Sequence, residues 1–253
     1  MKKYLLVAAF ALLVMVAFSS VAYAQTPVNV TTIARGSSER QASGGAPSTQ
    51  PSEAGNTTSM SITVTDTSRR WQGFYGNVSG SITLADSSSN SLYNWINADP
   101  DGEVFASNHT TVNWPRIFCV NFSAAVAEEN LNRDSLNTYI GYTSDSDRAL
   151  KDSVNATFNQ TFGDDGSILR IGSRVITNAD NCSMVTLNTA SGYQTTQFKE
   201  VLLTDNQSVV FASILENNVN GFKNHPTDFE MIVGVNGTAT SATRNYYFFV
   251  ELT

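Results

Sequence analysis

The sequence predicts an all-β protein: a single antiparallel β-sandwich domain of jelly-roll type, with one or two short helices and a disordered N-terminal arm. Apolar and hydroxyl side chains alternate in short segments, which is typical of strands with one buried face. These segments recur about every 8–12 residues, and clusters of Asn, Asp, Gly and Ser separate them. Residues 59–253 are long enough to form one sizeable core, so we expect one domain over this range.

The strands are expected in two groups, on either side of a less regular middle. The first group covers residues 60–65, 79–84, 92–95 and 103–107, with turns at 86–90 and 97–102. The second group covers residues 198–204, 208–215, 229–235 and 246–252. Between the groups, the helix candidates are residues 124–131 and 147–158, the second with Asp145 or Ser146 as its cap.

Residues 1–24 have the features of a cleaved signal peptide. Two lysines form a basic start, an apolar run extends to Phe18, and the small residues Ala22 and Ala24 precede Gln25. The alternative is a retained membrane anchor, because the apolar run nearly reaches spanning length. We expect cleavage, a secreted or cell-surface protein, and no membrane span once the signal peptide is removed.

Residues 25–58 predict a flexible arm rich in Ser, Gly, Pro and Thr. The segment has no aromatic residue and cannot bury enough apolar surface to offset the entropy of ordering. Its only strand-like stretch is residues 28–33, next to the expected mature terminus. As a flexible chain the rest of the arm spans roughly 25–30 Å, enough to bring this stretch to the sheet edge of a neighbouring molecule. The alternative is a spacer that makes no contact.

The charge of the chain excludes nucleic acid as a partner. Without the signal peptide, 13 Lys and Arg stand against 22 Asp and Glu, a net charge of −9 (13 − 22). Lys151, Lys199 and Lys223 are the only lysines left, and no basic cluster remains. Binding to nucleic acid needs concentrated Lys and Arg to neutralise phosphates. The acidity is more consistent with solubility.

The two cysteines, Cys119 and Cys182, predict one disulfide. An exported chain with an even number of cysteines pairs them in an oxidising environment. The alternatives are two buried free thiols or half of a metal site. Neither His109 nor His225 lies at zinc spacing from a cysteine, which counts against the metal alternative.

The chain contains ten N-x-S/T sequons, an excess over the chance expectation for 24 Asn and 56 Ser and Thr. Such sequons are glycan acceptors on the accessible surface of an exported protein. The alternative is simple Asn and Thr richness in turns and strands. Asn181 lies beside Cys182 and is left out of the predicted set. The predicted acceptors are Asn29, Asn56, Asn77, Asn108, Asn121, Asn155, Asn159, Asn206 and Asn236.

No motif in the chain predicts catalysis or a cofactor. The sequence has no nucleophile elbow, zinc-protease motif, P-loop or dinucleotide fingerprint. The adjacent pairs Glu128/Glu129 and Asp164/Asp165 point their carboxylates apart along a helix or strand. We therefore expect that the protein is not an enzyme. The alternative is a hydrolase whose two carboxylates are far apart in the sequence.

One segment has the pattern of a calcium loop. Asn97, Asp99, Asp101 and Glu103 place oxygen atoms at alternate positions around Gly102, as a hard cation requires. The twelfth position of such a loop would be Asn108, which lacks a bidentate carboxylate. The alternative is a tight turn between two strands, for which Pro-Asp-Gly is a strong signal.

The aromatic residues Trp71, Phe74 and Tyr75 form the most distinctive local feature. Exposed on a sheet, their rings could stack on sugars, as in carbohydrate-binding modules. The flanking glycines favour the other interpretation, a close backbone approach with the rings packed into the core. We expect Trp95 and Trp114 in the core as well.

Several of these segments resemble a group of uncharacterised secreted archaeal β-rich surface proteins. The matching stretches include WQGFYGNVSGSITL at residues 71–84, LYNW at 92–95, GEVFAS at 102–107 and YYFFVEL at 246–252. Residues 198–205 and 228–233 fit the same group, so the resemblance covers most of residues 60–253. It implies an archaeal cell-surface or extracellular setting and no known activity.

In layout alone, the chain is similar to donor-strand fibre subunits such as archaeal bundling pilins and bacterial biofilm-matrix fibre proteins. A β-domain must dispose of its edge strands, and a tethered strand can pair with a neighbour's edge. The expected function is therefore a structural subunit that self-associates into a filament, matrix or surface layer. A carbohydrate-binding module and a secreted hydrolase are the alternatives.

Overall fold

The computed structural model describes residues 26–40, 49–63, 66–97, 101–120, 150–189, 192–193, 197–235 and 243–252. The protein is an all-β single domain, as the sequence predicts, with 40% of the described residues in strands and 8% in helices. Residues 1–24 and the helix candidate at 124–131 lie outside the described residues.

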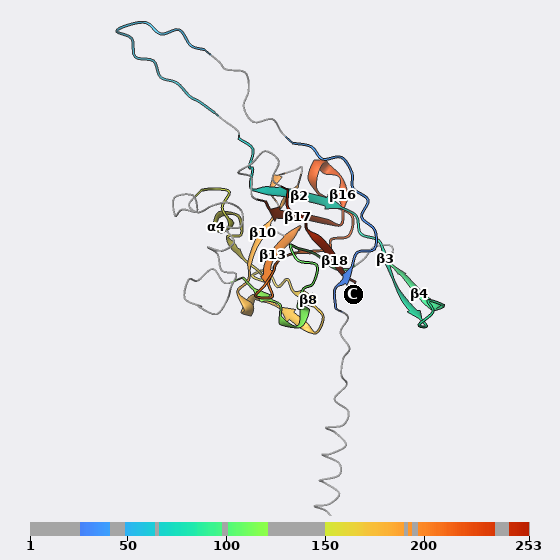
Figure 1. Ribbon diagram of the computed structural model, residues 1–253. Helices are drawn as coiled ribbons and strands as arrows, with labels where there is room; N and C mark the ends of the chain where they lie inside the picture. Colours follow the sequence, from blue (N-terminus) through green and yellow to red (C-terminus); the bar gives the residue numbers. More distant parts are fainter. Residues whose placement is uncertain are drawn as a thin grey trace, which may run out of the picture.

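An eight-stranded antiparallel sheet forms the centre of the molecule (Figure 1). The strands follow the order β1-β18-β5-β14-β13-β10-β7, and β6 pairs with β13 beside this path. Their bounds are β1 (Val28–Asn29), β5 (Gly102–Ser107), β6 (Phe118–Cys119), β7 (Gln160–Thr161), β10 (Ser183–Thr186), β13 (Lys199–Thr204), β14 (Val209–Ile214) and β18 (Tyr247–Leu252).

The remaining described strands form two-stranded sheets. These are β2 (Trp71–Gly76) with β17 (Phe229–Gly234), β3 (Gly80–Ala85) with β4 (Ser91–Asn97), β8 (Leu169–Ile171) with β9 (Arg174–Ile176), β11 (Asn188–Thr189) with β12 (Gly192–Tyr193), and β15 (Val219–Asn220) with β16 (Pro226–Thr227). The helical turns are α4 (Val154–Thr157), η1 (Trp114–Arg116), η2 (Asn178–Asp180) and η3 (Phe222–Asn224).

The central strands are buried on both faces, whereas alternation in the sequence predicts one buried face. Every residue of β13 is buried. On one face, Leu202 and Phe211 pack with Met231 of β17. On the other face, Leu203 and Val210 pack in one cluster with apolar residues of β8 and β9. The β2–β17 and β8–β9 sheets therefore cover the two faces of the main sheet, and this covering explains the difference from the prediction.

Most of the predicted strands are confirmed. The segments expected at 79–84, 92–95 and 103–107 form β3, β4 and β5, and the four C-terminal segments form β13, β14, β17 and β18. The strand expected at 60–65 is wrong over its described part, because residues 60–63 form no strand and Ile62 is 80% exposed. The expected caps Asp145 and Ser146 lie outside the described residues. Ser153 caps α4 instead, where its Oγ accepts the Ala156 N–H at 3.3 Å.

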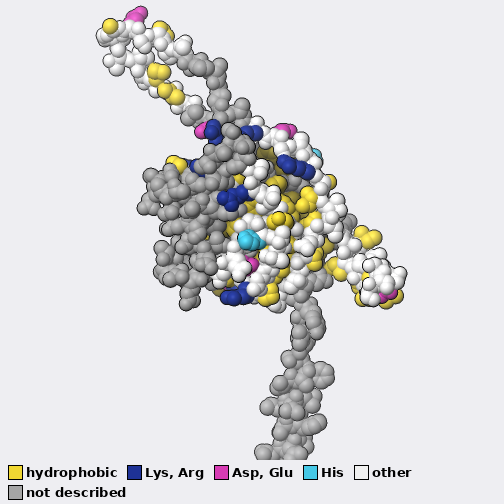
Figure 2. Space-filling model, in the orientation of Figure 1, with side chains coloured by type: hydrophobic (Ala, Val, Ile, Leu, Met, Phe, Trp, Pro, Cys, Tyr) yellow, Lys and Arg dark blue, Asp and Glu magenta, His cyan; other side chains and the backbone are white. Residues whose placement is uncertain are grey.

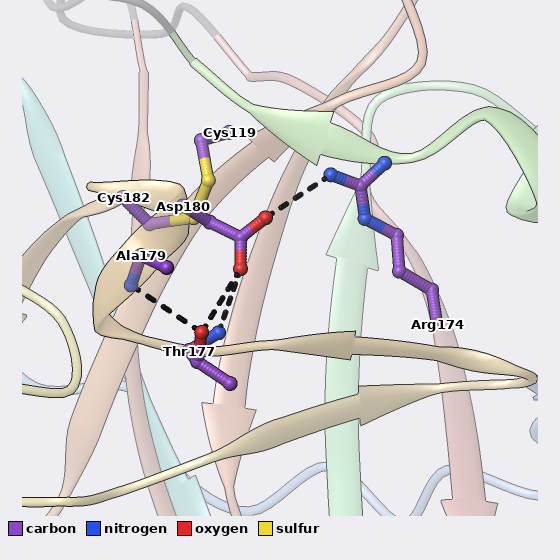
Figure 3. The surroundings of a disulfide bond; sticks show 6 residues. All are labelled: Cys119, Arg174, Thr177, Ala179, Asp180 and Cys182. Carbon is purple, nitrogen blue, oxygen red and sulfur yellow. Dashed lines mark hydrogen bonds and ion pairs between the residues drawn. A yellow bond between two sulfur atoms is a disulfide. The ribbon is translucent and has the colours of Figure 1, made fainter.

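The predicted disulfide is present and joins Cys119 of β6 to Cys182 (Figure 3). The two residues are 63 positions apart in the chain, and their Cα atoms lie 4.9 Å apart. Cys182 is completely buried in the core and directly precedes β10. Beside it, Thr177 and Asp180 form a capping box on η2, and Asp180 also pairs with Arg174 at 3.5 Å. The bond thus ties β6 to the start of β10, its neighbour on the same side of β13.

Candidate functional site

The N-terminal arm forms the outermost strand of the main sheet. β1 pairs antiparallel with β18, so that Val28 lies opposite Val250 and Asn29 opposite Phe249. The Val30 N–H extends the pairing by donating to the Phe248 carbonyl at 3.3 Å. In Figure 1 the blue N-terminal segment runs along this edge of the body, beside the C-terminal strand. The strand-like stretch predicted at 28–33 therefore meets a sheet edge, and this edge belongs to its own molecule.

The docking of β1 rests on few contacts. Its strand is two residues long and Val28 is 62% exposed, so the apolar burial beside it is limited to Pro27, which is buried, and Val30, which is half-buried. Beyond β1, Glu39 of the arm pairs with Lys223 of η3 at 2.7 Å, but both side chains are mostly exposed. Exposed ion pairs of this kind stabilise little, because water and salt screen their charges. The arm is therefore held weakly on the edge that it covers.

The edge strand beneath it is held firmly. β18 pairs with β5 along all six of its residues, from Tyr247 opposite Ser107 to Leu252 opposite Gly102. Phe249 is buried and stacks against Trp114 with ring centroids 5.1 Å apart. Release of β1 would therefore leave the main sheet intact. β18 would then be an open edge strand.

On the same two strands, Glu103 and Glu251 form a buried carboxyl pair. They lie directly opposite each other across β5 and β18, and each is 4% exposed. The Arg170 N–H donates to Glu103 Oε1 at 2.8 Å, and the Gly172 N–H donates to both Glu251 oxygens at 2.9 Å. The pair therefore fastens the β8–β9 hairpin to the main sheet, while Glu103 Oε2 has no hydrogen-bond partner among the described residues.

Burial dominates the electrostatics of this pair. Burial first, and the neighbouring Glu251 carboxylate to a smaller extent, raise the pKa of Glu103 to about 7, against the opposing effect of the Arg170 N–H and guanidinium. Burial also raises the pKa of Glu251. At pH 7 Glu103 is therefore partly protonated. Both carboxyl groups lie buried under the β8–β9 hairpin and not at the surface.

Further buried carboxylates play the same backbone-binding role. Glu200 is fully buried and accepts the Ile232 N–H of β17 at 2.8 Å. Glu230 accepts the Phe222 N–H, and Asp228 accepts the Val78 N–H at 2.8 Å. Sequence analysis missed this set. The signal that could have found it is an acidic residue inside an otherwise apolar strand, where an N–H donor must lie nearby.

The residues of the predicted calcium loop are not brought together in the described part of the chain. Glu103 is buried and already bonded to the β8–β9 hairpin, while Asp101 is exposed. The side chains of Asn97 and Asp99 lie outside the described residues. Among the described residues, no three His, Cys, Asp or Glu side chains gather as a metal requires. The turn interpretation gains support from Gly102, whose φ of +136° and contact with the Glu251 carbonyl suit only glycine.

The aromatic candidates divide between core and surface. Phe74 packs edge-to-face on Phe248 at 5.4 Å, and Trp71 packs on Phe158 at 5.9 Å, so both belong to the core. Tyr75 is 48% exposed and contacts Phe222 at 5.2 Å, with the two ring planes tilted by 59°. Trp114 packs in the core as expected, but the expectation for Trp95 is wrong, because it is 51% exposed.

The predicted glycan acceptors differ in exposure. Asn29, Asn56, Asn77 and Asn159 are exposed, whereas Asn108, Asn155 and Asn206 are partly buried. Asn108 Oδ1 accepts the Val209 N–H at 3.0 Å, and Asn206 Oδ1 is buried. Asn121 and Asn236 lie outside the described residues.

The chain matches no protein-family model, and comparison with curated proteins and with solved structures finds no match. Within the described residues, no helix has the length and apolar character needed to cross a membrane.

Proposed function

We propose that the protein is a secreted, glycosylated structural subunit of an extracellular or cell-surface assembly, and that its N-terminal strand links neighbouring copies. The pairing of β1 with the edge strand β18 carries the proposal. A strand that fits this edge in its own molecule fits the same edge of another copy with the same hydrogen bonds. The resemblance to archaeal surface proteins is consistent with such a setting.

The arm has the length for exchange between copies. Residues 30–70 separate β1 from β2, and as a flexible chain they span about 35 Å. A tether of this length holds β1 near its own edge at an effective concentration on the order of millimolar or below. Weak docking and a long tether together allow a neighbour's edge to compete for the strand. Because each copy would donate one strand and accept another, the contact is head-to-tail and propagates.

Deletion of residues 25–58 tests this proposal. The truncated chain keeps β2 to β18 and should fold, but it should remain a monomer under conditions in which the full chain assembles. Because it can accept a strand but cannot donate one, it should also stop the growth of full-length assemblies when the two are mixed. If the truncated chain assembles to the same extent as the full chain, the arm is only a spacer and the proposal is wrong.

A point variant gives the same test at constant arm length. Val30→Pro removes the N–H that donates to Phe248, whereas Thr32→Pro alters the arm two residues further on, where no strand pairing occurs. Because Val30→Pro also removes the Asn29 sequon, both variants and the unaltered chain are compared without glycans. Light scattering should show slower or weaker assembly for Val30→Pro, and full-length behaviour for Thr32→Pro.

A further inference from the structure

The β3–β4 hairpin projects from the body (Figure 1), and apolar side chains are exposed on it (Figure 2). They lie on both of its faces. Leu92 and Ile96 of β4 are 81% and 83% exposed. On the opposite face, Leu84 lies across from Tyr93 and Ile82 across from Trp95, and the Tyr93 and Trp95 rings meet at 4.8 Å. Monomeric proteins rarely expose such a continuous apolar surface without a partner.

No other described strand covers or extends the β3–β4 hairpin. Within the described residues, β3 and β4 pair only with each other, so both outer edges of the hairpin are open. An isolated two-stranded hairpin is at best marginally stable in water. A further element that covers its faces or extends its edges would supply the missing burial.

The low charge of the hairpin and its position next to β18 favour a second copy of this chain as the element that covers it. Asp86 is the only charged residue between Arg70 and Asp99, so another acidic copy can approach the hairpin with little charge repulsion. The base of the hairpin also packs against β18, since a Cβ on Gly80 would lie 2.6 Å from Leu252 Cδ1. A neighbour that exchanges β1 on β18 is therefore delivered beside the hairpin.

The hairpin is less suited to other occupants. The Tyr93 and Trp95 rings lie at 67° to each other and do not form the flat platform that stacks on a sugar. At the tip, Asp86 accepts the backbone N–H groups of Ser88 and Asn90, so a polar, charged turn would have to enter a membrane first.

We infer that the β3–β4 hairpin is a second contact between copies of this chain, beside the exchanged N-terminal strand. This inference rests on the proposed function, because strand exchange brings the second copy to the hairpin. Its apolar faces would then be buried in the assembly, and its side chains would set how tightly neighbouring copies associate.

The test replaces the two most exposed apolar side chains of the hairpin in the full-length chain. Leu92→Ser/Ile96→Ser should raise the concentration needed for half-maximal assembly by about tenfold or more, because two buried side chains are lost from each contact. Ile168→Ser/Val175→Ser removes apolar side chains that are 42% and 41% exposed elsewhere on the body, and serves as the control. Analytical ultracentrifugation gives the midpoint, and a photo-reactive residue at position 96 identifies what the hairpin touches.

The outcomes separate this inference from the proposed function. Cross-links from position 96 to another copy, together with the raised midpoint, support the hairpin contact. Unchanged assembly of Leu92→Ser/Ile96→Ser overturns it, even if deletion of residues 25–58 abolishes assembly as the proposed function requires. Binding of the monomer to vesicles of neutral or anionic lipid, lost in Leu92→Ser/Ile96→Ser, would also overturn it in favour of a membrane contact.

Discussion

Glu103 and Glu251 lie directly opposite each other on β5 and β18, and their carboxylates accept N–H groups from one hairpin, β8–β9. Two acidic side chains at neighbouring buried positions would repel each other if both were ionised. Their arrangement is stable because backbone donors face them and because one proton can remain on the pair. The sheet edge that receives β1 is therefore built on a group whose charge changes near neutral pH.

The first prediction is that the protein is more stable at mildly acidic pH than at neutral pH. Burial raises the pKa of Glu103 to about 7 from 4.5, so the folded protein holds a proton that the unfolded chain releases. The free energy of unfolding therefore falls as pH rises from about 4.5 to about 7, by about 3 kcal/mol if the whole shift is realised. The raised pKa values of Glu200, Glu230 and Glu251 act in the same direction.

Thermal unfolding at pH 5 and pH 7.5 checks this prediction. Glu103→Gln keeps an acceptor for the Arg170 N–H but cannot titrate, so its melting temperature should change less between the two pH values. Asp101→Asn alters an exposed carboxylate two residues away and should retain the full change. Equal pH dependence in the Glu103→Gln variant and the unaltered chain would show that the carboxyl pair does not hold the proton.

The second prediction concerns the disulfide between Cys119 and Cys182. Closing a loop over a separation of 63 residues stabilises the folded state by about 4 kcal/mol on the chain-entropy model. Cys119→Ala/Cys182→Ala should lower the free energy of unfolding in urea by roughly that amount. Mass spectrometry after alkylation provides the independent check: two reactive thiols in the native chain without reductant would mean that the bond does not form.

The third prediction is that glycan occupancy follows the exposure of the sequons. Asn56, Asn77 and Asn159 are exposed, whereas Asn206 has a buried Oδ1 and its backbone adopts φ +75° in a tight turn. A glycan on Asn206 would force this side chain out of its buried position. Glycopeptide analysis of native protein should therefore find sugars at the exposed sites. A glycan on Asn206, together with unmodified Asn56 and Asn77, would contradict the prediction that occupancy follows exposure.

The local sequence pattern was sufficient to predict the positions of most strands. It was not sufficient to predict which of their faces other elements cover. Alternation located β3, β4 and β5, but it also placed Trp95 in the core, because alternation alone does not show whether another element covers a face. The role of Glu103 was equally hidden, since its donor, Arg170, lies 67 residues further along the chain. The strand character of residues 28–33 was visible, whereas the edge that it meets depends on the topology of the whole sheet.

Exchange of the N-terminal strand between copies can be measured directly with single cysteines on the two paired strands. Val28 lies opposite Val250, so a chain carrying Val28→Cys and a chain carrying Val250→Cys can form a disulfide only if β1 of one copy pairs with β18 of the other. Ile62→Cys, 80% exposed between the arm and β2 and outside the pairing, is the control partner for Val250→Cys. The account predicts disulfide-linked dimers from the first mixture under assembly conditions and few or none from the control. Assemblies that form without this cross-link, while a single chain carrying both substitutions cross-links internally, would contradict it.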